Sequence, residues 1–201
     1  MMQLSIPVEQ RCAERGDNMS KLTFRKLGLS RDEIEAQARA GKKFKERAAQ
    51  TWIAMHEMAK PDDSEISNFE AMVGKLPQDF RQFLKDYNGG IPSLPLLKTH
   101  SNERVIEAFL ALKAPKGFSD SIAYAIKIYG TRIPSSTIPI ASAGGGDLLL
   151  LYIGPGKFGE ILYWDHNLES DEDNTSDYFD NTELVASSFS ELLGKLAPDI
   201  A

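Results

Sequence analysis

The chain has 201 residues, of which 42% are hydrophobic and 26% are charged, and its single cysteine is Cys12. This is the composition of a globular protein with a buried core, and one cysteine excludes a disulfide framework and a site built from several thiolates. The sequence has no apolar run as long as a membrane span, and its N-terminus lacks the features of a secretory signal. We therefore expect a cytoplasmic protein.

The net charge of -6 is unevenly distributed along the chain. Residues 1–60 contain 12 Lys and Arg against 8 Asp and Glu, which gives +4, whereas the remainder contains 11 against 21, which gives -10. The acidic remainder argues against nucleic acid as a partner, because phosphate binding requires a basic surface. It favours basic proteins instead, although solubility alone also accounts for an acidic surface.

The first 60 residues are expected to form a tail and a helical extension. Residues 1–19 are either a disordered tail or a translated leader, because the residues before Met19 permit codons that contain a ribosome-binding signal. Residues 20–60 form the extension, in which a capping box at Ser30 predicts one helix. A stripe of apolar residues at helical spacing predicts a second helix, which ends at Pro61.

The most distinctive stretch is LPQDFRQFLKDYNGG, at residues 76–90. Pro77 suits the first turn of a helix, and Asn88 with the two glycines after it tolerates the left-handed conformation that ends one. The helix between them presents one apolar face, which consists of Phe80, Phe83, Leu84 and Tyr87. The stretch carries no obvious chemistry, so we expect its role to be architectural.

Residues 61–201 are predicted to form one α+β domain, because helices come first and strands cluster later. A strand is predicted at 105–112 and a helix at 119–129, with Ile122, Ala123, Ile126 and Tyr129 facing inward. Strands are predicted at 137–141, 148–153 and 160–164, the last two as a hairpin, and a final helix at 185–196.

The sequence contains no convincing catalytic or metal motif. Its histidines, His56, His100 and His166, are too far apart in sequence to form a local metal pair. The stretch from Gly144 to Asp147 indicates a tight turn, since a phosphate loop requires a lysine and a following helix. The acidic stretch from Asp171 lacks the glycine and the final carboxylate of a calcium loop. We expect no enzymatic activity, no cofactor and no metal.

The stretch Tyr163-Trp164-Asp165-His166 is the richest cluster of functional side chains. Strand alternation places Ile161 and Tyr163 on one face and Trp164 on the other. Asp165 either pairs with His166 or, as we favour, ends the strand by bonding to local backbone. Tyr163 or Trp164 is a candidate anchor for a partner if its side chain proves exposed.

Four segments together resemble the SUKH superfamily, which is named partly for yeast regulators of cell-wall glucan synthesis. They are LPQDFRQFLKDYNGG, TIPIASAGGGDLLLLYIG, GEILYWDHNLE and VASSFSELLGKL, which follow one another between residues 62 and 197. The resemblance implies a central, mostly antiparallel sheet flanked by helices. It does not cover the extension at residues 20–60.

The resemblance also implies a function. Many bacterial members of the superfamily are immunity proteins of polymorphic toxin systems, which bind a cognate toxin, often a nuclease. Other members are regulatory scaffolds, so a scaffold or ligand-binding domain is the alternative. For an immunity protein the partner is a basic toxin domain, and neither nucleic acid nor a membrane is bound. The expected partner-binding residues are Tyr163, Trp164, Asp165, Asp171, Glu172, Asp173 and Asp177.

Overall fold

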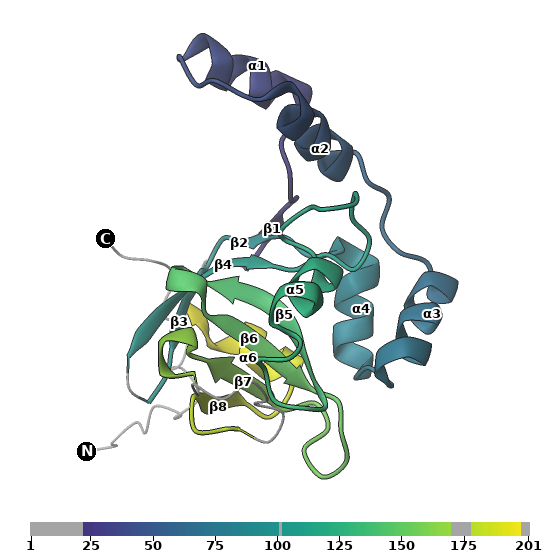
Figure 1. Ribbon diagram of the computed structural model, residues 1–201, viewed down its shortest axis with the longest axis vertical. Helices are drawn as coiled ribbons and strands as arrows, with labels where there is room; N and C mark the ends of the chain where they lie inside the picture. Colours follow the sequence, from purple (N-terminus) through teal and green to yellow (C-terminus); the bar gives the residue numbers. More distant parts are fainter. Residues whose placement is uncertain (1–21, 101, 170–177, 198–201) are drawn as a thin grey trace, which may run out of the picture.

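The computed structural model describes residues 22–100, 102–169 and 178–197 (Figure 1). The helices are α1 (Arg31–Arg39), α2 (Glu46–His56), α3 (Asp63–Val73), α4 (Gln78–Tyr87), α5 (Ile122–Tyr129) and α6 (Phe189–Lys195). The strands are β1 (Phe24–Arg25), β2 (Ile91–Pro92), β3 (Leu96–Lys98), β4 (Glu103–Phe109), β5 (Thr137–Ala143), β6 (Leu148–Tyr152), β7 (Ile161–Trp164), β8 (Thr182–Ala186) and β9 (Leu196–Ala197).

One antiparallel sheet of seven strands, in the order β8-β7-β6-β5-β4-β3-β9, forms the centre of the molecule. The prediction of an α+β fold with a central antiparallel sheet is therefore confirmed. The sheet curls, so that the loop between β3 and β4 approaches β8 at the far edge (Figure 1). There the backbone amide of His100 donates a hydrogen bond to the carboxylate of Glu183.

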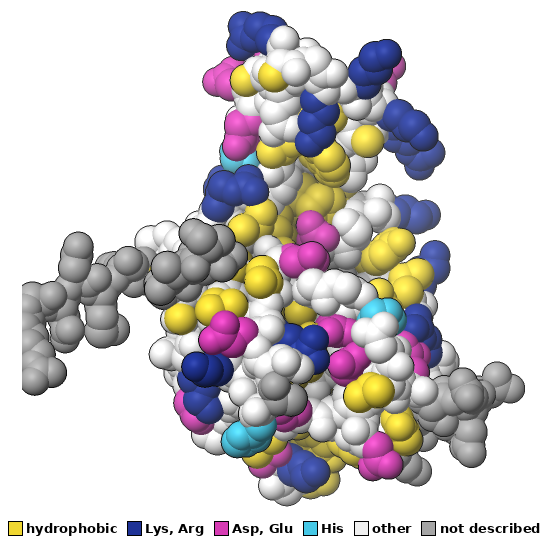
Figure 2. Space-filling view, turned by 90° about the vertical axis from the view of Figure 1, so that its left-hand side faces the viewer, with side chains coloured by type: hydrophobic (Ala, Val, Ile, Leu, Met, Phe, Trp, Pro, Cys, Tyr) yellow, Lys and Arg dark blue, Asp and Glu magenta, His cyan; other side chains and the backbone are white. Residues whose placement is uncertain are grey.

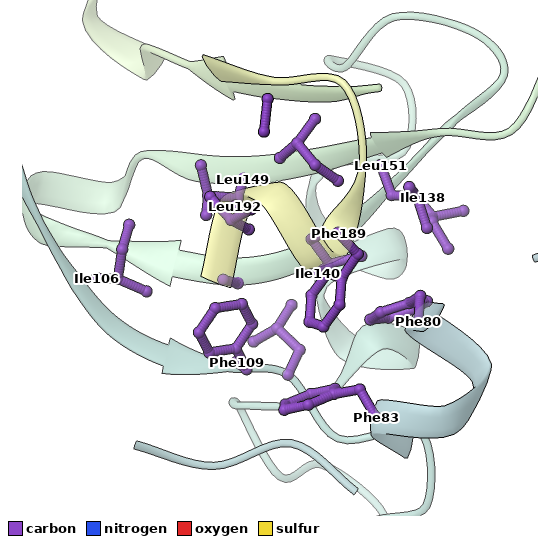
Figure 3. Close-up of a cluster of buried hydrophobic side chains, with 14 of the residues drawn as sticks. Phe80, Phe83, Ile106, Phe109, Ile138, Ile140, Leu149, Leu151, Phe189 and Leu192 are labelled. Carbon is purple, nitrogen blue, oxygen red and sulfur yellow. The ribbon is translucent and has the colours of Figure 1, made fainter. Parts of the chain in front are cut away.

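The main core lies between the sheet, α4 and α6 (Figure 3). Phe80 and Phe83 of α4 contact Phe189 of α6, with ring centroids 5.0 Å and 4.9 Å apart, and Phe83 also contacts Phe109 of β4 at 5.4 Å. All four rings are buried. The apolar face predicted for this helix is thus correct for its first three members, whereas Tyr87 is 45% exposed at the end of α4.

A second, smaller core covers the opposite face of the sheet. Leu162 and Trp164 of β7 pack there with Leu148 and Leu150 of β6, while Ile161 and Tyr163 belong to the main core. The predicted alternation of β7 and the hairpin of β6 with β7 are both confirmed. Because both faces of β6 are covered, its four leucines are all buried.

The stretch at residues 76–90 joins α3 and α4 to the sheet through polar contacts at both of its ends. The buried carboxylate of Glu70 in α3 accepts a hydrogen bond from the Leu76 amide at 3.0 Å and pairs with Arg81 at 2.6 Å. At the other end Asn88 adopts φ 54°, and a Cβ on Gly89 would lie 2.7 Å from the Phe109 carbonyl oxygen. A larger residue is excluded at Gly89 by this approach, which gives the motif an architectural role.

Two predicted details are wrong. The final helix starts at Phe189, because Val185 and Ala186 belong to β8, whose pairing with β7 extends to Ala186. In α5 Ile122 is buried as predicted, but Ala125 is buried in place of Ala123, which is exposed. The pairing of β8 with β7 and the rotation of α5 about its axis depend on tertiary contacts, so local sequence alone does not determine either of them.

Within residues 22–60, α1 and α2 project from the body (Figure 1), whereas Phe24 of β1 packs against Phe83 and Phe109 of the main core. In this extension α1 has no buried residue and α2 has one, Met55, which packs with Leu27. β1 pairs with β2, a strand that the sequence analysis did not predict. At the turn after β1, Gly28 has φ +79° and a Cβ there would lie 2.3 Å from the Trp52 carbonyl oxygen, so this close contact requires glycine.

Candidate functional site

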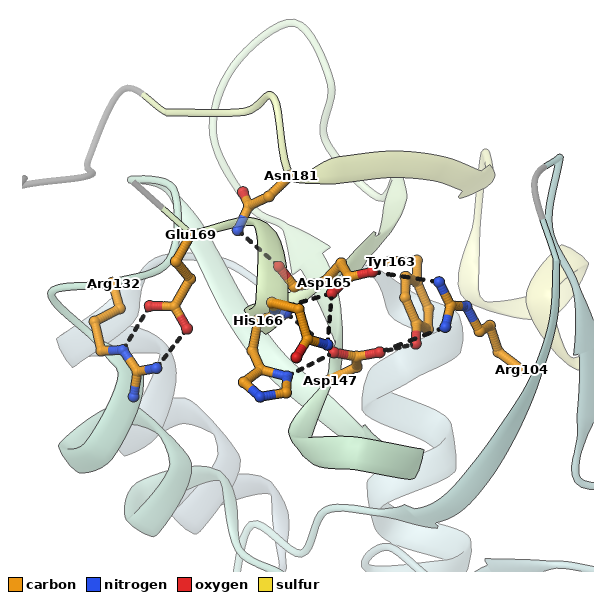
Figure 4. Close-up of polar contacts among 9 residues, drawn as sticks. Arg104, Arg132, Asp147, Tyr163, Asp165, His166, Glu169 and Asn181 are labelled. Carbon is orange, nitrogen blue, oxygen red and sulfur yellow. Dashed lines mark hydrogen bonds and ion pairs between the residues drawn. The ribbon is translucent and has the colours of Figure 1, made fainter. Parts of the chain in front are cut away.

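A group of charged and polar side chains gathers at the end of the sheet where β7 ends and β6 begins (Figure 4). We call this group the polar edge, and its members are Arg104, Arg132, Asp147, Tyr163, Asp165, His166, Glu169 and Asn181. It combines residues from β4, β7, the loop after α5, the turn before β6 and the segments on either side of residues 170–177. The curl of the sheet brings Arg104 to the others across two intervening strands.

Asp147 is the buried centre of the polar edge, with a side chain only 2% exposed. Its carboxylate accepts hydrogen bonds from the Tyr163 hydroxyl and from the His166 backbone amide at 3.0 Å, and it contacts the His166 Nδ1 at 3.0 Å. Burial alone would raise the pKa of Asp147, but the hydrogen bonds from Tyr163 and His166 outweigh it and hold this pKa below its usual value. Asp147 is therefore an ionised acceptor at neutral pH.

Tyr163 is the complementary partner of Asp147. Burial, reinforced by the hydrogen bond to Asp147 and by its negative charge, raises the pKa of Tyr163. The phenol therefore stays protonated and donates. The Arg104 guanidinium lies over the ring, with its Cζ 4.9 Å from the ring centroid. These contacts hold Tyr163 in place, and they leave its hydroxyl no role as a proton acceptor.

Asp165 ends β7 as the sequence analysis favoured. Its Oδ1 accepts a hydrogen bond from the Asn167 backbone amide at 2.9 Å, which is the local backbone contact expected of an aspartate at a turn. Its Oδ2 accepts from Arg104 Nη2 at 3.3 Å, and its carbonyl oxygen accepts from Asn181 Nδ2 at 3.1 Å. His166 bonds to Asp147 rather than to Asp165.

The polar edge contains a cluster with metal-ligand chemistry, since Asp147, Asp165 and His166 bring ligand atoms within 4.8 Å of one another. The same carboxylates already accept hydrogen bonds from the protein, and the Arg104 guanidinium lies 3.3 Å from Asp165 and 3.9 Å from Asp147. A fixed positive charge at that distance opposes a second cation. The arrangement fits a structural ion-pair network better than a metal centre.

The expected partner-binding residues fall into three groups. Tyr163 is 3% exposed and Trp164 is completely buried, so neither offers the exposed aromatic surface that an anchor requires. Asp165 is partly exposed and is paired with Arg104. Four further residues lie outside the described part of the chain, namely Asp171, Glu172, Asp173 and Asp177.

Sequence reasoning missed the two residues that organise the polar edge. Asp147 was considered only as part of a glycine turn. The missed signal was that four leucines follow it, which makes it a polar residue at the start of a buried strand. Arg104 carried no signal, because its contact with Asp165 spans 61 positions of sequence.

Three hollows of the described surface are relevant to binding. A cavity of about 170 Å³ lies at the polar edge beside Arg104, Asp165 and Asn181. A second, of about 200 Å³, lies between α5 and the turn that holds Asp147. A groove of about 490 Å³ separates the extension from α4, and Figure 2 shows hydrophobic side chains gathered in the narrow region beneath the projecting helices.

Residues 60–195 match the SMI1 / KNR4 family (SUKH-1), so the chain belongs to this family. It is also 28% identical over 157 residues to the "SPbeta prophage-derived uncharacterized protein YokK" of Bacillus subtilis (strain 168), covering 68% of this chain and 75% of that protein. No solved structure matches the chain.

The family match confirms the resemblance to the SUKH superfamily, whose members are generally non-enzymatic immunity or regulatory domains. It leaves α1 and α2 outside the matched residues. Among the helices that the structure describes, none has the length and apolar character needed to cross a membrane.

Proposed function

We propose that this protein is a non-enzymatic immunity protein, which binds and neutralises a basic, nuclease-type toxin domain. Membership of the SUKH-1 family supports a protein-binding role. The relative in Bacillus subtilis is described as prophage-derived, which favours a toxin system over regulation of the cell wall. The partner is expected to be a protein made by the same cell, so the cytoplasm is the expected location.

The acidic composition of residues 167–183, next to the polar edge in sequence, is the observation that carries the proposal. Between Asn167 and Glu183 the sequence contains seven acidic residues and no basic one. The nearby cations Arg104 and Arg132 are each already paired with a carboxylate of this edge, at Asp165 and Glu169. The edge thus retains an excess of negative charge, which steers a basic partner toward it and opposes nucleic acid.

The contacts within the polar edge support a role without catalysis. A general base needs a free lone pair directed at a substrate, and a nucleophile needs a base beside it. Asp147 is saturated with donors, and Tyr163 is held as a donor by Asp147. His166 uses its Nδ1 on Asp147, and no nucleophile among the described residues is bonded to its ring.

A regulatory, ligand-binding domain is the second candidate, and the groove beside the extension favours it. Its volume of about 490 Å³ lies within the range of about 300–1,000 Å³ that is usual for small-molecule sites. Phe24, Leu27, Met55 and Tyr87 supply apolar lining. Lys26 and Lys60 supply positive charge at the same groove, and Glu57 and Asp86 supply negative charge.

The decisive experiment uses the C-terminal domain of the protein encoded directly upstream of this gene. That domain is expressed in bacteria with and without the full chain, and growth is recorded together with co-purification of the two proteins. Immunity predicts that growth stops with the domain alone, recovers with both, and that the two proteins form a stable complex. A harmless upstream product, or a toxic one that this chain neither binds nor suppresses, would contradict the proposal.

A further inference from the structure

The cavity of about 200 Å³ beside α5 has a distinctive lining, and we call it the Tyr124 cavity. Its lining residues are Glu107, Leu110, Ser119, Asp120, Tyr124, Ala125, Tyr129, Ser142, Ala143, Gly146, Asp147 and Leu148. Three of these carry carboxylates, two are tyrosines, and none is basic. With less volume than the roughly 300 Å³ at which small-molecule sites begin, the cavity suits one long side chain.

The same end of the molecule holds two arginines of this chain by one repeated arrangement. Arg104 lies over the Tyr163 ring at 4.9 Å and pairs with Asp165 at 3.3 Å. A guanidinium held in this way gains both the attraction of the aromatic face and a charge-assisted hydrogen bond.

Arg132 repeats the arrangement a short distance away. Its Cζ lies 5.1 Å from the Tyr129 ring centroid, and its Nε donates to the Glu169 carboxylate at 2.7 Å. Its Nη2 donates to the other oxygen of Glu169, which makes the pair bidentate. The carboxylate raises the pKa of Arg132, so this guanidinium stays charged.

The Tyr124 cavity contains the same components without the arginine. Tyr124 is 38% exposed, Glu107 is exposed, and Asp120 is partly exposed. Among the described residues, Asp120 accepts a side-chain hydrogen bond only from the neighbouring Ser119 hydroxyl, and no cation is paired with Asp120 or Glu107. The third combination of tyrosine and carboxylate at this end is therefore open to a cation from outside the chain.

We propose that the Tyr124 cavity receives an arginine side chain of the protein partner, with Glu107 and Asp120 binding the guanidinium and Tyr124 providing its ring face. The inference rests on the proposed function for the source of the arginine. A flat, bidentate guanidinium fits this lining better than an ammonium, as the two internal examples use arginine in both cases.

The cavity can be tested without the toxin by NMR titration of the full chain with N-acetyl-arginine methylamide. The matched probe is N-acetyl-citrulline methylamide, which has nearly the same shape and no charge. We expect the arginine probe to shift the amide resonances of Ser142, Ala143 and Gly146 saturably, and the citrulline probe to leave them unchanged. Equal binding of both probes, or no saturable shift with arginine, would overturn the proposal.

Variants link the response to the named side chains. Glu107→Gln with Asp120→Asn should weaken arginine binding roughly fivefold or more, because two charge contacts are lost. Tyr124→Leu, which keeps apolar volume, should also weaken it. The control pair, Glu103→Gln with Asp32→Asn, removes the same charge from exposed positions outside the cavity and should bind as the wild type does. Equal weakening in the control pair and the cavity pair would refute a local site.

The outcome separates this inference from the proposed immunity function. Failure of the arginine titration with intact protection against the upstream toxin domain would contradict the arginine site and leave the proposed immunity function standing. A positive titration with no protection would support the arginine site and contradict the immunity function. Preserved dispersion of the amide spectrum in each variant shows that its fold is intact, so that lost binding is assigned to the site.

Discussion

Asn88 and Lys113 are joined by two hydrogen bonds in opposite directions. Asn88 Nδ2 donates to the Lys113 carbonyl oxygen at 2.7 Å, and Asn88 Oδ1 accepts from the Lys113 amide at 3.0 Å. The same oxygen accepts from the Leu112 amide at 3.1 Å. Since Asn88 also ends α4 in the left-handed conformation, one side chain both stops a helix and fixes the loop that follows β4.

Replacing Asn88 with alanine should lower the free energy of unfolding by about 2–4 kcal/mol. Two partly buried amides and a carbonyl lose their partner, and alanine adds strain at positive φ. Urea denaturation measures the change. Asn88→Gly is the matched control, because it loses the same hydrogen bonds without the strain and should be about 1 kcal/mol less destabilised. Equal losses in the two variants would show that the left-handed conformation costs nothing here.

Phe83→Ala should lower the free energy of unfolding by about 3–5 kcal/mol, the usual range for a buried phenylalanine. Its ring is 4% exposed and contacts Phe24, Phe109 and Phe189. Tyr87→Ala on the same helix removes a ring that is 45% exposed and should cost clearly less. Urea denaturation measures the free energy of unfolding of both variants. A decrease below about 1 kcal/mol for Phe83→Ala would place that residue outside the core.

The polar edge should make stability depend on pH through Asp147. Burial acts to raise the pKa of this carboxyl, but the hydrogen bonds from Tyr163 and His166 lower it overall, so the folded state favours the ionised form. The stabilisation is therefore present above the pKa of an unfolded aspartate, about 3.9, and is lost as pH falls through the lower pKa of the folded state.

Asp147→Asn should remove that part of the pH dependence and lower stability at neutral pH. Urea midpoints of the wild type and of Asp147→Asn, measured from pH 7 to pH 3, test this. The difference between the two midpoints should narrow below about pH 4. Asp32→Asn on exposed α1 is the control for removing one carboxylate. Parallel curves for wild type and Asp147→Asn would mean that Asp147 has the same pKa in the folded and unfolded states.

Local signals predicted the parts of this fold that neighbouring residues determine. The capping box at Ser30, the apolar face that begins at Phe80 and the alternation of β7 are all set within one turn or one strand. The start of α6 was mispredicted because the N-cap signal at Ser188, whose side chain accepts a hydrogen bond from the Glu191 amide, was overlooked, whereas Val185 favours the strand that pairs with β7.

The polar edge was beyond local reasoning for a different reason. Tyr163, Asp165 and His166 were recognised as a cluster, but their partners are Asp147, 16 to 19 positions away from Tyr163 and His166, and Arg104, 61 positions from Asp165. Only the curl of the sheet brings β4 to the end of β7. From sequence alone, the cluster therefore suggested exposed side chains that bind a partner. In the structure Tyr163 and Trp164 are buried instead and have structural roles.

The acidic residues beyond this edge should act by steering a basic partner. Replacing Asp171, Glu172 and Asp173 with Asn, Gln and Asn removes three charges while keeping side-chain shape. Stability should be nearly unchanged if these side chains are exposed, since surface charges contribute little to folding. Association with the toxin domain should slow about tenfold at low salt, and the difference should shrink as salt rises and screens the remaining charges. Stopped-flow association rates across a salt series measure both effects. Equal rates for wild type and triple variant at low salt would remove these residues from recognition and leave solubility as the reason for their charge.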